Sequence, residues 1–171
     1  LGGSFDAVAA QLGLRKGEWL GEDVGSPFNY PAQGILFVPD RLAAPGPGWP
    51  TAAALDTARQ LVSAAGGRAL VLMASWRGVE VMSEALAGLV EGPLIVQRKG
   101  ESTAGLIRAF AEDPGSVLVG TLGLWQGVDV PGDACTLVII DKLPFPPPTD
   151  PVVSARQAAI DADGGSGWMQ V

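Results

Sequence analysis

The sequence predicts an α/β fold built on a doubly wound, mostly parallel sheet. Short apolar runs rich in β-branched residues recur along the chain, and segments with helical spacing lie between them. These runs are continuously apolar, as expected for strands that are buried on both faces. Their alternation with helices is typical of parallel sheets made of strand–helix–strand units. The predicted strands cover residues 34–38, 69–74, 94–97, 116–119 and 136–140.

The predicted helices cover residues 51–65, 77–90, 103–112 and 151–162. The first of these is rich in Ala and Leu, with Thr51 suited to cap its start and Gly66 suited to end it. The third places Leu106 and Phe110 on one face and stops at the Asp-Pro-Gly sequence that begins at Asp113. Apolar residues at helical spacing indicate that each of these helices packs on one side of the sheet.

Two proline-rich segments, residues 39–50 and 144–151, are predicted to be surface loops, because proline lacks the N–H group that helices and central strands require. With 47% hydrophobic residues, we expect residues 1–171 to form a single domain with a substantial core. The sequence opens without a leader and stops soon after a Gly/Ser-rich loop. We therefore expect both ends to be cut and the chain to be a fragment of a larger protein.

The composition excludes several kinds of site. With a single cysteine, Cys135, and no histidine, an internal disulfide, a zinc site and a histidine-based catalytic triad are not expected. No apolar run reaches the ~18 residues of a membrane span, so we expect no membrane association and a cytoplasmic location. The formal net charge of −7 disfavours nucleic-acid binding unless cations gather locally. Arg77, Arg98, Lys99 and Arg108 lie in the middle third of the chain and could form such a stripe, although each alone is more simply a solvated surface charge.

The most informative segment lies between two predicted strands, at residues 120–132, and reads GTLGLWQGVDVPG. A strand that ends in Gly120-Thr121 places a hydroxyl and backbone N–H groups at the edge where open parallel sheets bind ligands. The glycines that follow allow a phosphate to approach the backbone closely, and Asp129 offers an acceptor for a ribose hydroxyl or an arginine. The chain has no P-loop and no G-x-G-x-x-G fingerprint, so it has no triphosphate site of its own.

A second segment, residues 69–76, is a predicted strand that ends in Ser75-Trp76. Ser75 and the N–H groups that open the next helix could form an anion site reinforced by the helix dipole. The simpler alternative is that Ser75 only caps this helix and that Trp76 packs in the core.

These segments resemble motifs of superfamily 2 helicases of the DinG/XPD-like branch. Residues 120–132 resemble motif V and residues 69–76 resemble motif IV. Further similarity covers residues 1–6 (the end of motif III), 26–30, 139–145 and 150–153. Because the order and spacing agree over almost the whole chain, the chain is identified as an incomplete second RecA-like domain of an ATP-dependent DNA helicase. The resemblance implies that motif VI, with its arginine finger, would follow in the parent protein. Gln126 departs from the glutamate usual in motif V.

The resemblance also implies roles for individual residues. Gly127 and Asp129 would face the nucleotide cleft, whereas the residues expected at the DNA backbone are Ser75, Trp76, Gly120 and Thr121, with Arg77, Arg98 and Lys99 as weaker candidates for phosphate contacts. The partners would be single-stranded DNA, on which the motor would run 5′ to 3′, and the first RecA-like domain. That first domain would supply the P-loop, the Mg²⁺ site and, in some relatives, an iron–sulfur cluster.

On this interpretation the parent protein uses ATP and Mg²⁺. The isolated chain would bind no cofactor or metal, hold no catalytic residue and be inactive. The alternative is a non-catalytic α/β domain that regulates by binding a protein partner or a small nucleotide, which the acidic charge and the missing catalytic motifs would also fit.

Overall fold

The computed structural model describes residues 5–143 and 150–167. The chain divides into two compact units, Leu1–Asp40 and Arg41–Val171, and each is described by itself. The described residues include no helix that is both long and apolar enough to cross a membrane. The second unit contains the sheet and carries every candidate site residue named above.

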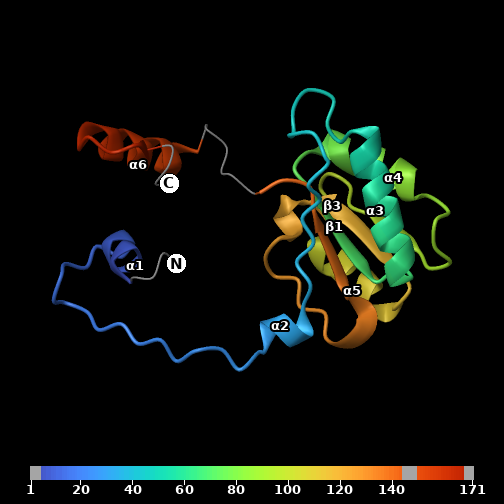
Figure 1. Ribbon diagram of the computed structural model, residues 1–171, viewed down its shortest axis with the longest axis horizontal. Helices are drawn as coiled ribbons and strands as arrows, with labels where there is room; N and C mark the ends of the chain where they lie inside the picture. Colours follow the sequence, from blue (N-terminus) through green and yellow to red (C-terminus); the bar gives the residue numbers. More distant parts are fainter. Residues whose placement is uncertain (1–4, 144–149, 168–171) are drawn as a thin grey trace. The chain divides into compact units, whose positions relative to one another are not determined.

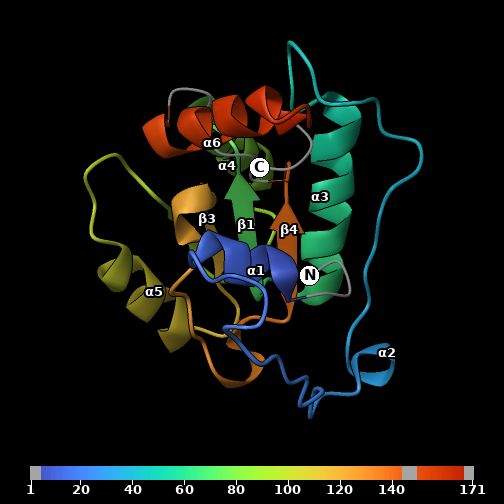
Figure 2. The same ribbon diagram turned by 90° about the vertical axis from the view of Figure 1, so that its left-hand side faces the viewer.

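The sheet has four parallel strands in the order β2-β3-β1-β4, and Figures 1 and 2 show β1 at its centre. The strands are β1 (Ala69–Met73), β2 (Leu94–Val96), β3 (Val117–Thr121) and β4 (Leu137–Ile140). Ala69 pairs with Val117 on one side and with Leu137 on the other. At the far end, Met73 pairs with Thr121. This register brings the carboxyl ends of neighbouring strands to one edge of the sheet.

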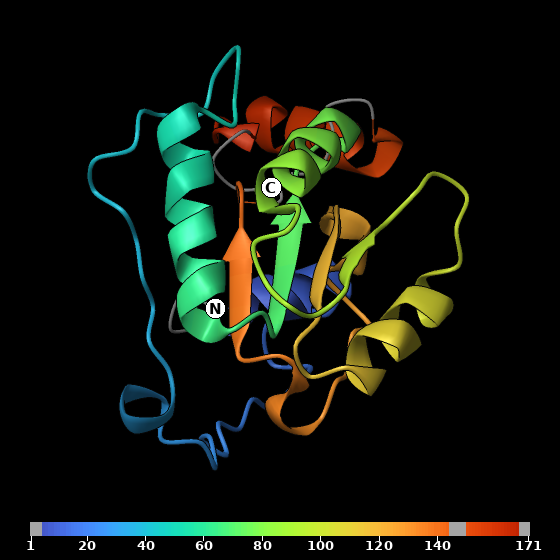
Figure 3. The same ribbon diagram turned by 90° about the vertical axis from the view of Figure 1, so that its right-hand side faces the viewer.

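Helices cover both faces of the sheet, which confirms the predicted doubly wound α/β fold. They are α3 (Ala52–Ala65), α4 (Trp76–Leu86) and α5 (Thr103–Glu112). On the face seen in Figure 3, Val62 of α3 and Met82 of α4 pack with Val71. On the opposite face, Phe110 of α5 packs with Leu118. Side chains that alternate along the buried strands therefore enter two separate cores.

The boundaries of α3, α5 and α6 follow the predicted signals closely, whereas α4 ends at Leu86 instead of residue 90. The Thr51 side chain accepts a hydrogen bond from the Ala54 N–H at 3.3 Å, and α3 ends at Gly66 with a left-handed φ of 64°. The last helix, α6 (Pro151–Ala162), starts at Asp150, whose carboxylate accepts from two backbone N–H groups of the first turn. The short 3-10 helices η1 (Leu122–Leu124) and η2 (Gly132–Ala134) lie between β3 and β4 in sequence.

The first unit contains the short helices α1 (Asp6–Gln11) and α2 (Tyr30–Gln33). The strand predicted over residues 34–38 is not formed, and Ile35 and Leu36 are 96% and 91% exposed. An apolar run becomes a strand only where a neighbour pairs with its N–H and C=O groups. Sequence pattern alone does not reveal whether such a neighbour is available, and the prediction of a strand here was wrong.

The structure describes the first of the two predicted loops in full and only the end of the second. Residues 39–50 contain no helix or strand and are mostly exposed. Of the second loop, residues 144–149 lie outside the described residues.

The Gly66-Gly67 pair provides a matched test of the turn into β1. Both glycines have positive φ. An added Cβ at Gly67 (φ 82°) would clash with the Gly115 carbonyl oxygen, at 2.0 Å. An added Cβ at Gly66 would meet nothing within 4 Å. We expect Gly66→Ala to cost about 1 kcal/mol of unfolding free energy, from backbone strain alone. Gly67→Ala should cost at least about 3 kcal/mol, because a clash adds to the strain. Urea unfolding of both variants measures the difference, and equal losses would show that Gly115 moves away freely.

Candidate functional site

The carboxyl ends of the strands gather the residues predicted from motifs IV and V. Ser75 and Trp76 follow β1, Arg98 and Lys99 follow β2, and Thr121 ends β3. We call the residues at these strand ends (74–77, 97–99, 120–121 and 141–142) the carboxyl edge. The predicted juxtaposition of these segments at one edge agrees with the parallel pairing.

Ser75 is the N-cap of α4 and is exposed. Its Oγ accepts a hydrogen bond from the Gly78 N–H at 3.0 Å. The capping role expected in the simpler alternative is therefore real, and it uses only a lone pair of the hydroxyl. The hydroxyl proton remains able to donate to an acceptor such as a phosphate oxygen. Capping and anion binding are thus compatible at this residue.

Trp76 and Lys99 come together at the carboxyl edge, although they are 23 positions apart in sequence. The Lys99 Nζ lies 5.9 Å from the centroid of the Trp76 ring, within reach of a cation–π interaction. Trp76 is half-buried, so it is not a core aromatic, while Lys99 is exposed. The exposed residues Arg77 and Arg98 adjoin this pair in sequence. The edge therefore concentrates positive charge beside an aromatic ring.

Thr121 is held by a residue that lies outside the motif segments. Gln97 Oε1 accepts hydrogen bonds from the Thr121 backbone N–H at 2.7 Å and from its hydroxyl at 3.0 Å. Gln97 is only 8% exposed. Gly120 leaves room for it, since a Cβ at that position would lie 2.8 Å from Gln97 Oε1 and 2.4 Å from Leu124 Cδ1. Gly120 is buried, so its packing role is clear.

Gly127 and Asp129 lie in a different environment from the carboxyl edge. Gly127 has a φ of 79° in the loop after η1, and Asp129 is exposed. Asp129 lines a groove of about 370 Å³ over the sheet face that α5 partly covers. The rest of the lining is Leu70, Leu72, Leu124, Trp125, Val128, Val130, Cys135, Val138 and Ile140. Gly127 and Asp129 therefore lie apart from the DNA candidates, and no cation among the described residues lines the groove.

Sequence reasoning missed Asp141 and Lys142 as members of the carboxyl edge. Both follow β4, so the rule that parallel strands end at one edge could have identified them. The Asp141 carboxylate accepts from the Ala74 N–H at 3.0 Å and from the Trp49 indole N–H. It thereby ties the 39–50 loop and β4 to the residue before Ser75. Lys142 adds a half-buried cation.

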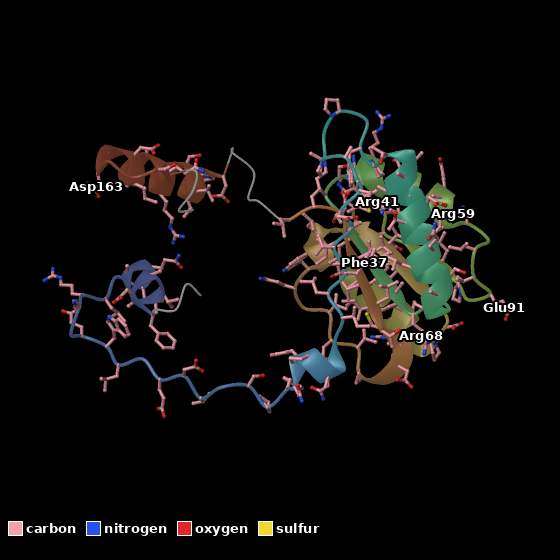
Figure 4. All side chains as sticks on the ribbon, viewed as in Figure 1. Phe37, Arg41, Arg59, Arg68, Glu91 and Asp163 are labelled. Carbon is pink, nitrogen blue, oxygen red and sulfur yellow. The ribbon has the colours of Figure 1, made fainter. Side chains whose placement is uncertain are left out.

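Arg59 and Arg68, labelled in Figure 4, contact other parts of the second unit. The Arg59 guanidinium donates to the Ala85 carbonyl and so links α3 to α4. Arg68 precedes β1, at the opposite end of the strand, and its Nε donates to Ala65 at 2.9 Å. The described residues hold no cluster of three or more acidic, histidine or cysteine side chains placed to bind a metal ion.

The fold and the residues at its edge define an α/β domain of the RecA-like helicase class. The family model described as helicase C-terminal domain matches residues 58–171, and the chain belongs to this family as a DinG-like member. No solved structure shows a significant match.

Relatives of known name agree with this assignment. The ATP-dependent helicase DinG of Mycobacterium tuberculosis is 46% identical over 173 residues, which cover 100% of this chain and 26% of that protein. The ATP-dependent DNA helicase YoaA of Escherichia coli is 35% identical over 166 residues, covering 95% of this chain and 25% of that protein. The probable ATP-dependent helicase YpvA of Bacillus subtilis is 34% identical over 165 residues, covering 95% and 24%. This chain thus spans about a quarter of the length of these relatives.

The position of Cys135 in the groove leads to a prediction about the reactivity of its thiol. Burial raises the pKa of the Cys135 thiol above the ordinary value for cysteine. At a given pH the thiolate fraction is therefore smaller, and the thiolate is the reactive form. We expect alkylation by iodoacetamide at about pH 8 to be slower than for a free thiol and to speed up at higher pH. Because the chain has one cysteine, mass spectrometry reads it directly. A rate equal to that of the guanidinium-unfolded chain would contradict the assigned burial.

Proposed function

We propose that this chain is the second motor domain of a cytoplasmic ATP-dependent DNA helicase, with residues 1–171 as one domain truncated before motif VI. It would supply one side of the ATP cleft and part of the track for single-stranded DNA. The observation that carries the proposal is the gathering of Ser75, Thr121 and several cations at one edge of a parallel sheet. Family membership supports it independently.

On the DNA side, the chemistry of the carboxyl edge suits a phosphate backbone better than base edges. Ser75 has a hydroxyl proton to donate, and Lys99, Arg98 and Arg77 carry exposed positive charge that can neutralise phosphates. Trp76 presents a half-buried ring on which a base could stack, an interaction worth about 1–3 kcal/mol. Gly120 and Thr121 would shape the backbone beside the DNA. Such a surface binds single strands with little sequence preference.

On the nucleotide side, the proposal needs a second domain. The chain has no P-loop, and none of the described residues that line the groove beside Asp129 is a cation. A triphosphate with Mg²⁺ would be held chiefly by the first RecA-like domain of the parent protein, while Gly127 and Asp129 close the cleft from this side. The isolated chain would then neither bind ATP tightly nor hydrolyse it. Cycles of cleft closure and opening would move the two domains along DNA in the 5′ to 3′ direction.

The DNA track predicts a specific salt dependence. In the full-length protein, Lys99→Glu and Arg77→Glu should each weaken single-strand binding about equally for all sequences. Each should also flatten the plot of log affinity against log salt by roughly 0.7 for every phosphate that is no longer neutralised. Arg59→Glu, at the contact between α3 and α4, is a control with the same change in charge. Fluorescence anisotropy at several salt concentrations provides the measurement. Wild-type affinity and slope in both edge variants would show that the DNA does not run along this edge.

We expect a substitution of Asp129 to affect ATP hydrolysis without affecting the stability of the fold. In the full-length protein, Asp129→Ala should lower kcat/KM for ATP at least about tenfold, which corresponds to about 1.4 kcal/mol of transition-state stabilisation. The fold should remain intact because an exposed carboxylate contributes little packing. Asp133→Ala, in the neighbouring η2, is the matched control. Unchanged kinetics together with a lowered melting temperature would instead assign Asp129 a role in capping its turn.

A further inference from the structure

Gln97 differs from the residues that follow it. Arg98, Lys99 and Gly100 are exposed, whereas Gln97 is only 8% exposed. A carboxamide is costly to bury unless its polar atoms find partners. Gln97 meets this requirement across the sheet, through two hydrogen bonds from Thr121 to a single oxygen atom. Both of these hydrogen bonds come from one residue, which ends the neighbouring strand β3.

The backbone holds Gln97 in register for this contact. The Gln97 N–H donates to the Val119 carbonyl at 2.9 Å, which extends the pairing of β2 with β3 by one step. The side chain then spans from the end of β2 to the end of β3, over the space that Gly120 leaves open. Because the Thr121 backbone N–H can only donate, the atom facing it must be the carboxamide oxygen. That oxygen in turn receives the hydroxyl proton of Thr121.

This arrangement sets what Thr121 can offer at the carboxyl edge. The N–H and O–H groups of Thr121 both donate to Gln97, so its hydroxyl offers only lone pairs to a ligand. An ionised phosphate oxygen has no proton to donate to these lone pairs. Thr121 thus differs from Ser75, whose proton is available. Thr121 contributes by fixing the chain where β3 passes into η1, and Gln97 is the residue that holds it there.

We propose that Gln97 is a positioning residue for the DNA track: it locks the end of β3 to the end of β2, which carries Arg98 and Lys99. The two segments then meet the DNA backbone as one preorganised surface. Without the lock, each segment would be ordered only when DNA binds, and that ordering would weaken affinity. The inference rests on the proposed function, because it assumes that this edge contacts single-stranded DNA.

The test uses the full-length protein and measures ATP hydrolysis against the concentration of oligothymidine. Gln97→Met keeps the length of the side chain and removes the acceptor. We expect it to raise the half-saturating DNA concentration about three- to tenfold, in line with the loss of two ordinary hydrogen bonds.

Ser116→Ala is the matched control for lost stability. Ser116 is fully buried just before β3 and donates to the Phe110 carbonyl at 3.0 Å, so its loss weakens the same strand from the opposite end. It should lower the melting temperature and leave the DNA response unchanged. A second pair covers the possibility that Gln97→Met fails to fold: Thr121→Ser keeps the hydroxyl and the wild-type DNA response, whereas Thr121→Val weakens the response. Combining Thr121→Val with Gln97→Met should add nothing to the effect of Gln97→Met alone.

The outcomes separate the two proposals. If the wild-type protein shows no stimulation by DNA, the proposed function fails. If DNA stimulates the wild type and Gln97→Met responds at the same DNA concentration, the lock has no role and the inference about Gln97 is overturned. A DNA response shifted as much in Ser116→Ala as in Gln97→Met would also overturn it, because general destabilisation would then explain the effect.

Discussion

β1 is hydrogen-bonded on both sides, to β3 and to β4, and all five of its residues are buried. Every other feature of the second unit depends on this strand. Its parallel pairing determines that Ser75, Thr121 and Asp141 emerge at one edge, and its alternating side chains feed both cores. A one-residue slip of β3 against β1 would send the apolar side chains of β3 to the wrong faces and move Thr121 along the edge. Core packing therefore fixes the register, and the register assembles the edge.

Charge is distributed in a way that the net value of −7 conceals. Arg59 and Arg68 are used structurally, since each donates to a backbone carbonyl away from the edge. Arg77, Arg98 and Lys99 are exposed at the strand ends instead. Because charges more than about 8 Å apart are largely screened at physiological salt, a local group of cations acts on a nearby phosphate almost independently of distant carboxylates. An acidic domain can thus have a basic edge.

Much of this structure could be predicted from the sequence because its signals are local. Apolar runs located β1 to β4 to within a residue or two, and Thr51 and Gly66 located the ends of α3. The parallel order of the strands placed Ser75, Trp76 and Thr121 at one edge. Gln97 and Asp141 could not be singled out in this way, since their importance comes from hydrogen bonds to Thr121 and Ala74 on other strands. The prediction of a strand over residues 34–38 was wrong for the same reason, because a strand needs a neighbouring strand that its own sequence does not reveal.

The carboxyl edge and the groove beside Asp129 are connected by a short stretch of chain. Thr121, held by Gln97, leads directly into η1, whose Leu124 is 1% exposed and packs in the core beneath α5. The next residues form the loop that carries Gly127 and Asp129. Leu124 anchors the middle of this stretch, so a displacement of Thr121 must either move a close-packed side chain or be absorbed within about three residues. Under the proposed function, this short stretch of chain would connect the DNA track at the strand ends to the nucleotide cleft beside Asp129.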